Sequence, residues 1–160
     1  MFDYQCEWIR SFKDYYSFLS NFYQSKFMID DITFPTVEHF YQFKKTHNYD
    51  DALSLLKIDN PGKVKRISRS LPMRHDWDNI KRFVMATGVY EKFSQNLDLR
   101  NKLISTYPAY LLEGNTWHDN YWGHCSCDKC INKNHYNILG TILMSVRKEL
   151  KDNNYEDNKR

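Results

Sequence analysis

The feature that most constrains the fold is a series of helical signals that begins at Thr36. Thr36 directly follows Pro35 and is a good N-cap, and Val37 to Lys45 then places apolar residues three and four positions apart. Trp77 to Phe93 is the longest periodic segment, and its apolar side chains can line one helical face. Further helices are expected at residues 50–57, 63–70, 97–105 and 138–150. The chain is therefore predicted to be mainly helical.

Short β-strands are expected around these helices. Phe27 to Phe34 reads as a hairpin that turns at Asp30-Asp31. Trp8 to Phe12 and Tyr110 to Glu113 read as two further short strands, and an aromatic loop is expected at residues 17–23. The predicted fold class is α+β, a mainly helical single domain with a small β-sheet.

Length, charge and hydropathy limit the classes of protein to which this chain can belong. A chain of 160 residues fits one domain, expected at residues 1–150, with a frayed polar C-terminal tail at residues 151–160. A net charge of +3 is too small to indicate nucleic-acid binding by itself. Residues 1–10 do not resemble a signal peptide, and no apolar run approaches the ~20 residues that span a bilayer. We expect a cytoplasmic protein with no membrane partner.

Residues 114–137 are the least regular part of the chain. They lack apolar periodicity, yet their Trp residues and closely spaced Cys and His residues argue against disorder. The side chains of metal-binding type here are Cys125, Cys127, Cys130, His118, His124 and His135. Three thiols and one imidazole can close a structural zinc site, and Cys6 is a remote fourth thiol. Free or transiently oxidised thiols are the alternative, because C-x-C is tighter than the usual C-x-x-C pair.

Five groups of residues, taken in chain order, resemble the motifs of one family. They are Ser20-Asn21-Phe22; Pro35-Thr36-Val37-Glu38-His39 through Lys45; Pro61 through Arg69; Asp76-Trp77 with Val84-Met85 and Lys92-Phe93-Ser94-Gln95-Asn96; and Asp119 through Gly123 with Asn137 through Met144. Together they extend over roughly residues 8–150. By these motifs the chain resembles the NADAR superfamily of YbiA-like N-glycosidases. It departs from the pattern at Ser68, where the family often has Gly, and at His124, where many members have Asp.

The resemblance implies the YbiA-like fold and hydrolysis of an N-glycosidic bond with no required cofactor. It implies two activities. One cleaves phosphorylated ribosylamino intermediates of the early riboflavin pathway, and we expect this activity. The other removes ADP-ribose from modified guanine, with nucleic acid as the carrier of the substrate. A non-catalytic module that binds ADP-ribose or a nucleotide is a further alternative. The expected partner is thus a small ribosyl phosphate or an ADP-ribosyl compound.

Glu38 is the residue expected to carry the chemistry. If Thr36 caps the helix, Glu38 lies in the first turn, where unpaired N–H groups and the helix dipole favour an ionised carboxylate. Such a group can activate water or stabilise the cation-like sugar formed during glycosidic cleavage. Spacing alone also allows simple helix capping. Asp119 is expected to assist at the ribose, with a turn-forming role as its alternative.

Aromatic residues make up 16% of the chain, which leaves rings for stacking on a planar ligand. Trp122 stands beside Gly123 in the irregular stretch and is expected to stack on the base. Trp77 is expected to share that role or to shape the pocket, and packing in the core is its close alternative.

Polar residues are expected to hold the sugar and the phosphate. They are Asn21, Gln42, Lys45, Lys65 and Arg69. Gln42 and Lys45 follow Glu38 by one and two helical turns, so they lie near its face. Lys65 and Arg69 are four residues apart, and two cations on one face can grip a phosphate. A solvated surface position is the alternative for Gln42 and the three cations, and a structural role in a turn is the alternative for Asn21.

Overall fold

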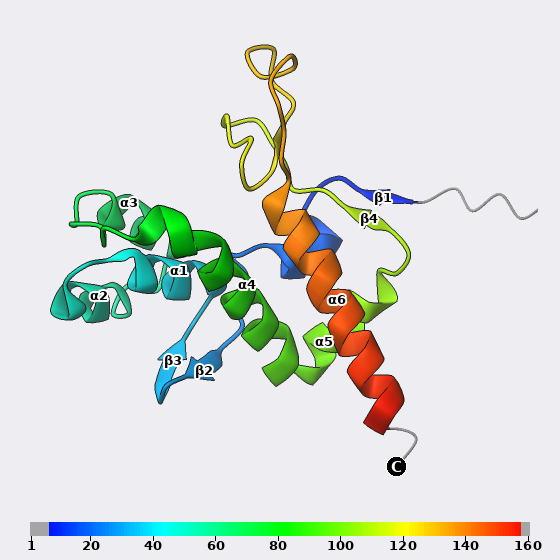
Figure 1. The fold of residues 1–160 in the computed structure, drawn as a ribbon, viewed down its shortest axis with the longest axis horizontal. Helices are drawn as coiled ribbons and strands as arrows, with labels where there is room; N and C mark the ends of the chain where they lie inside the picture. The colour runs from blue at the N-terminus through cyan, green and yellow to red at the C-terminus, as the bar shows by residue number, and fades with distance from the viewer. Residues whose placement is uncertain (1–6, 158–160) are drawn as a thin grey trace, which may run out of the picture. The chain divides into compact units, whose positions relative to one another are not determined.

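Residues 7–157 are described by the computed structural model, and they divide into two units (Figure 1). One unit comprises Asn21–Leu97. The other is formed by the chain on either side, up to Ser20 and from Asp98 onward. Both units consist mainly of helices with short strands, which confirms the α+β, mainly helical class. The strands form three separate two-stranded sheets where one small sheet was expected.

The β-hairpin of the Asn21–Leu97 unit is formed by β2 (Phe27–Ile29) and β3 (Ile32–Phe34). The strands are antiparallel and pair Phe27 with Phe34. Asp30 and Asp31, the loop between them, have φ angles of 50° and 62°. A two-residue hairpin loop of type I′ needs positive φ at both positions, and Asp tolerates that region better than most residues. The predicted turn is confirmed.

Four helices complete this unit: α1 (Val37–Lys45), α2 (Tyr49–Leu55), α3 (Pro61–Ser68) and α4 (Trp77–Gln95). The side chains of Thr36, Asn48 and Asn60 accept hydrogen bonds from the first turns of α1, α2 and α3. Asn60 is followed by Pro61 at the first helical position, so α3 begins two residues before the predicted start at Lys63. Side-chain caps therefore decide where these three helices begin.

The core of this unit is aromatic. The ring of Phe34 lies 5.9, 5.1 and 5.3 Å from the rings of Phe27, Phe40 and Phe43. Gly88 of α4 faces Phe40, because a Cβ atom built at Gly88 would lie 2.7 Å from the ring. The missing side chain lets α4 approach α1 closely, which makes α1 the central helix of the unit. Much of the aromatic content is thus used for packing.

Lys92 of α4 is 1% exposed, and burial lowers its pKa to about 7. Its ammonium nitrogen lies 5.4 Å from the centroid of the Tyr23 ring and 4.9 Å from that of Phe93. The folded pKa lies below the ordinary value of 10.5, so the unfolded chain binds the extra proton between these two pH values. The free energy of unfolding should therefore rise from pH ~7 to pH ~10.5, with a slope of at most about 1.4 kcal/mol per pH unit.

Lys92→Met is expected to remove this pH dependence and to be more stable than the parent chain near neutral pH. Urea unfolding of both proteins between pH ~7 and pH ~9.5 measures the difference. Lys63→Met, at an exposed position of α3, is the control and should follow the parent curve. Parallel curves for the parent and Lys92→Met would contradict the prediction.

The second unit contains the remaining elements. These are β1 (Trp8–Ile9), the 3-10 helix η1 (Asp14–Leu19), α5 (Leu97–Ser105), β4 (Tyr110–Leu111), β5 (Gly114–Asn115), β6 (His124–Cys125) and α6 (Ile138–Asp157). β1 pairs in parallel with β4, and β5 with β6. The predicted strands at the N-terminus and at residues 110–113 are confirmed in shortened form. Part of the loop predicted at residues 17–23 is instead the end of η1.

Helix α6 is fixed to β4 at its first turn (Figure 1). The Asn137 side chain donates to the Leu111 carbonyl at 2.9 Å and accepts from the Glu113 amide at 3.0 Å. At Gly140, a Cβ atom would overlap the carbonyl oxygen of Leu111. Farther along α6, the buried Arg147 donates to the Ala109 carbonyl at 2.9 Å. These contacts explain why Asn stands at position 137 and Gly at position 140.

α6 continues past the predicted end at Leu150 to Asp157. The segment from 151 to 157 contains neither Pro nor Gly, so nothing in the sequence stops the helix there. The polar tail was predicted at residues 151–160, and its last three residues lie outside the described range. Among residues 7–157, every helix is too short or too polar to cross a membrane.

Candidate active site

The first turn of α1 carries Glu38, and it is held by a side-chain cap and by a hydrogen bond to Asn21. The Thr36 hydroxyl oxygen accepts from the His39 amide at 3.2 Å, which is the predicted N-cap. The Glu38 amide donates to the carbonyl of Asn21 at 3.1 Å. Asn21 therefore supports the Glu38 backbone, while its own side-chain amide lies 3.3 Å from the sulfur of Met85.

His39 anchors the same turn from its buried side. Its Nε2 lies 2.6 Å from the carbonyl of Ile58 and its Nδ1 lies 2.8 Å from the hydroxyl of Thr36. A carbonyl can only accept, so Nε2 donates to Ile58. The imidazole thus links the Ile58 carbonyl to the Thr36 hydroxyl, and Glu38 is the residue next to it in the chain.

Glu38 ends a chain of three buried polar side chains. Gln42 donates from Nε2 to the Glu38 carboxylate at 2.7 Å, and its amide oxygen accepts from the Ser68 hydroxyl at 2.6 Å. All three residues are buried, and Glu38 is only 4% exposed. The Ser68 hydroxyl fixes which way the Gln42 amide faces, so Gln42 presents its N–H to Glu38.

Burial raises the pKa of Glu38 above its ordinary value. The hydrogen bond from Gln42 and the positive charges of Lys65, Lys45 and Arg69 act in the opposite direction. The expectation from the first helical turn was a carboxylate shifted toward ionisation, so the net direction is the reverse. The reason is desolvation, which outweighs the stabilising contacts in a site this buried. A carboxyl group with a raised pKa is a stronger base near neutral pH and suits acid–base chemistry.

Three cations surround this carboxylate. Burial lowers the pKa of Lys45, the charges of Arg69 and Lys65 lower it further, and Glu38 opposes the shift. The two lysines and the arginine repel one another, and Glu38 supplies only one negative charge among them. The group therefore has excess positive charge, which an anionic ligand would neutralise.

The structure brings together six of the predicted site residues. They are Asn21, Glu38, Gln42, Lys45, Lys65 and Arg69, all in the Asn21–Leu97 unit. Helix α3 packs against α1, and the charges of Lys65 in α3 and of Arg69, its C-cap residue, act on the Glu38 carboxyl group of α1. Their roles toward a substrate stay predictions.

Trp77 is 3% exposed and packs edge-on against Tyr41, with the ring centroids 4.7 Å apart. Burial of this extent favours the packing alternative for Trp77. A contribution to the site would then act through Tyr41, a neighbour in the core. Direct stacking of Trp77 on a base stays a prediction, and the small exposed fraction of its side chain does not support it.

Asp119 and Trp122 lie in the other unit and are close to each other. The Asp119 carboxylate accepts from the Tyr121 amide at 3.1 Å and from the Trp122 amide at 2.9 Å. This is the turn-forming role that was the alternative for Asp119. Trp122 is half-buried and meets Tyr121 edge-on at 5.0 Å. The expected roles of both residues at the substrate stay predictions.

Two residues beside the site were not selected from the sequence. Ser68 was noted only as a departure from the family pattern, yet it orients Gln42. Phe22 is 40% exposed, and the Lys65 ammonium lies 5.8 Å from its ring centroid. An exposed ring beside a cation offers a stacking surface for a planar group. In the sequence, the signal that could have identified Phe22 as a site residue was its place at the end of the Ser20-Asn21-Phe22 motif.

The predicted metal-binding residues also converge. Cys125, Cys127 and Cys130 gather around His118. His124 instead stacks on His135, with ring centroids 3.9 Å apart. Cys6 lies outside the described residues.

Comparison with known proteins identifies the family of the chain. The model of the NADAR domain family matches residues 8–151. The N-glycosidase YbiA of Escherichia coli strain K12 is 34% identical over 142 residues, which cover 88% of this chain and 85% of that protein. A riboflavin biosynthesis protein of Vibrio vulnificus is 33% identical over 139 residues, 86% of this chain and 36% of that longer protein.

The fold agrees as well. The NMR structure of Escherichia coli YbiA superposes with a TM-score of 0.80 at 31% identity, covering 92% of this chain and 86% of that one. Sequence and structure thus match the same family over nearly the whole chain. The chain belongs to the NADAR family, and its fold is that of YbiA.

Proposed function

We propose that this chain, a hydrolase of N-glycosyl bonds, acts on phosphorylated ribosylamino intermediates of the early riboflavin pathway. The observation that carries the proposal is the buried Glu38 carboxylate held by Gln42 amid three cations. Relatives named N-glycosidase support the reaction type. Relatives named for riboflavin biosynthesis support the substrate class. The parts of the proposal can be assigned to separate residues.

Glu38 would act as the base that activates water. In the reaction the bond between C1′ of the ribose and the base nitrogen breaks, and the water oxygen bonds to C1′. The water proton passes to the Glu38 carboxylate, and the departing nitrogen takes a proton from solvent. The sugar becomes cation-like on the way, and a nearby carboxylate lowers the energy of that state. Gln42 would keep the carboxylate oriented.

Lys45, Lys65 and Arg69 would bind the phosphate of the substrate. A phosphate dianion would neutralise the excess positive charge of the three cations. The Arg69 guanidinium can bind the phosphate by two parallel hydrogen bonds. Phe22 stands next to Lys65 and could cover the planar base. A neutral nucleoside would lack the anion, so we expect phosphorylated substrates to be preferred.

The direct test is incubation of the purified chain with a ribosylamino-pyrimidine phosphate and, separately, with ADP-ribosylated DNA. Release of ribose 5-phosphate in the first reaction supports the proposal. Release of ADP-ribose from DNA alone would replace the substrate with the nucleic-acid adduct. Tight ADP-ribose binding in calorimetry, with no release in either reaction, would make the chain a binding module.

The phosphate assignment predicts different effects for two adjacent lysines. Lys45→Met should raise KM for the phosphorylated substrate by roughly 10- to 100-fold. A change of this size is expected when one charge-assisted hydrogen bond to the substrate is lost. Lys44→Met is the matched control, because Lys44 faces Asp30 at 3.9 Å and the Phe40 ring. Initial rates at pH ~8 give both constants. Equal KM values for the two variants would remove Lys45 from the phosphate site.

A further inference from the structure

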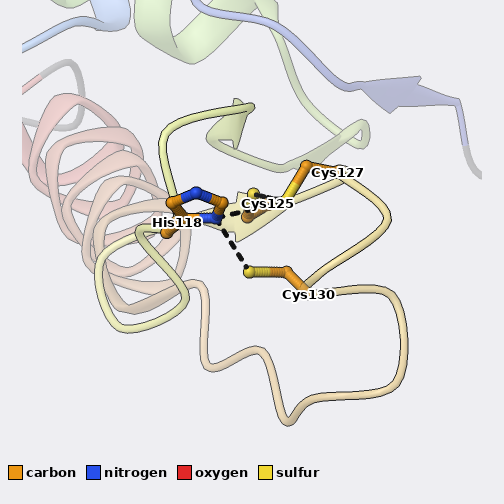
Figure 2. A group of neighbouring side chains, drawn as sticks. All are labelled: His118, Cys125, Cys127 and Cys130. Carbon is orange, nitrogen blue, oxygen red and sulfur yellow. Dashed lines mark hydrogen bonds between the residues drawn. The ribbon is translucent and has the colours of Figure 1, made fainter.

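We propose that His118, Cys125, Cys127 and Cys130 together bind one zinc ion that has a structural role. The four residues lie in the irregular segment 114–137, away in the sequence from Glu38 and its partners. Figure 2 shows the His118 ring and the sulfur atoms directed toward one another. The inference does not depend on the proposed substrate, because it rests only on this side-chain cluster.

The distances within the cluster fit a tetrahedral metal site. The four ligand atoms all lie within 4.8 Å of one another. The His118 Nδ1 is 3.2 Å from the Cys127 sulfur and 3.4 Å from the Cys130 sulfur, and the sulfurs of Cys125 and Cys127 are 3.3 Å apart. Zinc binds sulfur at about 2.3 Å and nitrogen at about 2.0 Å, so tetrahedral ligands lie about 3.5–3.8 Å apart. The three short separations differ from these values by only a few tenths of an ångström, and the widest separation, at most 4.8 Å, exceeds them by about 1 Å.

The backbone places the ligands from separate local structures. Cys125 belongs to β6, which pairs with β5. The Cys130 amide donates to the Cys127 carbonyl at 2.9 Å, closing the tight turn between these two thiols. His118 has a φ angle of 68°, a conformation that costs energy for a residue with a side chain, and its imidazole faces the thiols. Three local structures thus converge on one point.

The alternatives for the thiols fit less well. A disulfide needs sulfur atoms about 2.05 Å apart, whereas the sulfurs of Cys125 and Cys127 are 3.3 Å apart and all three thiols are free. Cys125 and Cys130 are fully buried, so they are shielded from oxidants. His124 and His135 pack against each other, which leaves His118 as the imidazole of the site.

The ligand set also indicates what the ion would do. Four protein ligands complete a tetrahedron and leave no position for water, which is typical of structural zinc and not of catalytic zinc. The ion would tie residues 118–130 together. His118 precedes Asp119 directly, so the turn that holds Asp119 and Trp122 would be stabilised by the metal.

The experiment measures metal in the 160-residue chain, purified without added zinc. Elemental analysis should find one zinc per chain. Replacement by Co²⁺ should give the strong tetrahedral and thiolate-to-cobalt absorption bands of a site with several thiolates. Zinc far below one per chain, in protein that also fails to take up added Zn²⁺, would overturn the proposal. So would cobalt spectra without thiolate bands.

Variants test the identity of the ligands. Cys127→Ser and His118→Ala should each weaken Zn²⁺ binding at least about 100-fold in competition with a chromophoric chelator. His124→Asn is the matched control, an imidazole that stacks on His135 outside the cluster, and it should retain the metal. Retention of full affinity by both cluster variants would overturn the assignment.

A second measurement applies where a cluster variant does not fold. Hydrogen exchange of the parent chain with and without chelator should show faster exchange at the amides of Cys130 and Ile131, which donate to the Cys127 carbonyl. Amides in α1 should be unchanged. Unchanged exchange at residues 118–131 after zinc removal would contradict the structural role.

Discussion

Glu38→Gln is expected to lower kcat for the ribosylamino phosphate at least about 10³-fold while KM changes little. The substitution keeps the size of the side chain, and its amide oxygen can still accept the hydrogen bond from Gln42. What it removes is the base and the negative charge beside C1′. Steady-state kinetics with the parent and the variant give both constants.

The pH profile of the parent enzyme gives an independent check on the same residue. Activity requires the carboxylate, so kcat/KM should fall as the pH drops through the pKa of Glu38. Because burial raises that pKa above the ordinary 4.5, the acid limb should lie above pH 4.5. Any residual activity of Glu38→Gln should lack this limb.

The same variant should gain stability at neutral pH. A carboxyl group whose pKa is raised on folding holds its proton more tightly in the folded chain, so the free energy of unfolding falls as the pH rises through the shifted range. The amide introduced by Glu38→Gln carries no charge and avoids this cost. A more stable but inactive variant in urea unfolding would separate a catalytic role from simple misfolding.

Glu91→Gln is the control for both measurements, because Glu91 is a half-buried carboxylate of α4 that contacts Gln95. It should keep its activity and its pH profile. Full activity of Glu38→Gln would leave the family assignment intact but remove the proposed mechanism.

Gly140→Ala should destabilise the chain by about 2–4 kcal/mol, because the added methyl group overlaps the Leu111 carbonyl and the Asn137 side chain. Backbone atoms cannot move aside as a flexible side chain can, so α6 has to shift off β4. Loss of the two Asn137 hydrogen bonds to Leu111 and Glu113 would add to the cost. Urea or thermal unfolding measures the change, with a decrease in Tm of roughly 5–15 °C.

Thr141→Ala is the matched control at the next position of α6. Thr141 is exposed and its side chain adds only a hydrogen bond to the Asn137 carbonyl. Its effect should stay within about 0.5–1 kcal/mol. Similar losses for the two variants would show that the close approach at Gly140 does not hold α6 in place.

Local chemistry made several elements predictable. The Asp30-Asp31 turn, the Thr36 cap and the periodicity of α4 depend on residues a few positions apart. Such features can be inferred from neighbouring residues alone. The same holds for the i, i+4 spacing of Lys65 and Arg69.

The site depended on contacts between distant parts of the chain. The hydrogen bond from Ser68 to Gln42 spans 26 positions, and no local pattern indicates it. Trp77 has a sequence context that suits ligand binding as well as packing, and only burial against Tyr41 favours packing. Among three histidines near the thiols, the fold selected His118.

The sequence by itself determined the helices, the hairpin, the family and the identity of the candidate carboxylate, because each follows from local spacing or from ordered motifs. Tertiary structure alone decided that Glu38 is buried and surrounded by cations. Its pKa consequently moves in the direction opposite to the one its place in the helix suggested. Desolvation depends on everything packed around a group, and that information is spread over the whole chain.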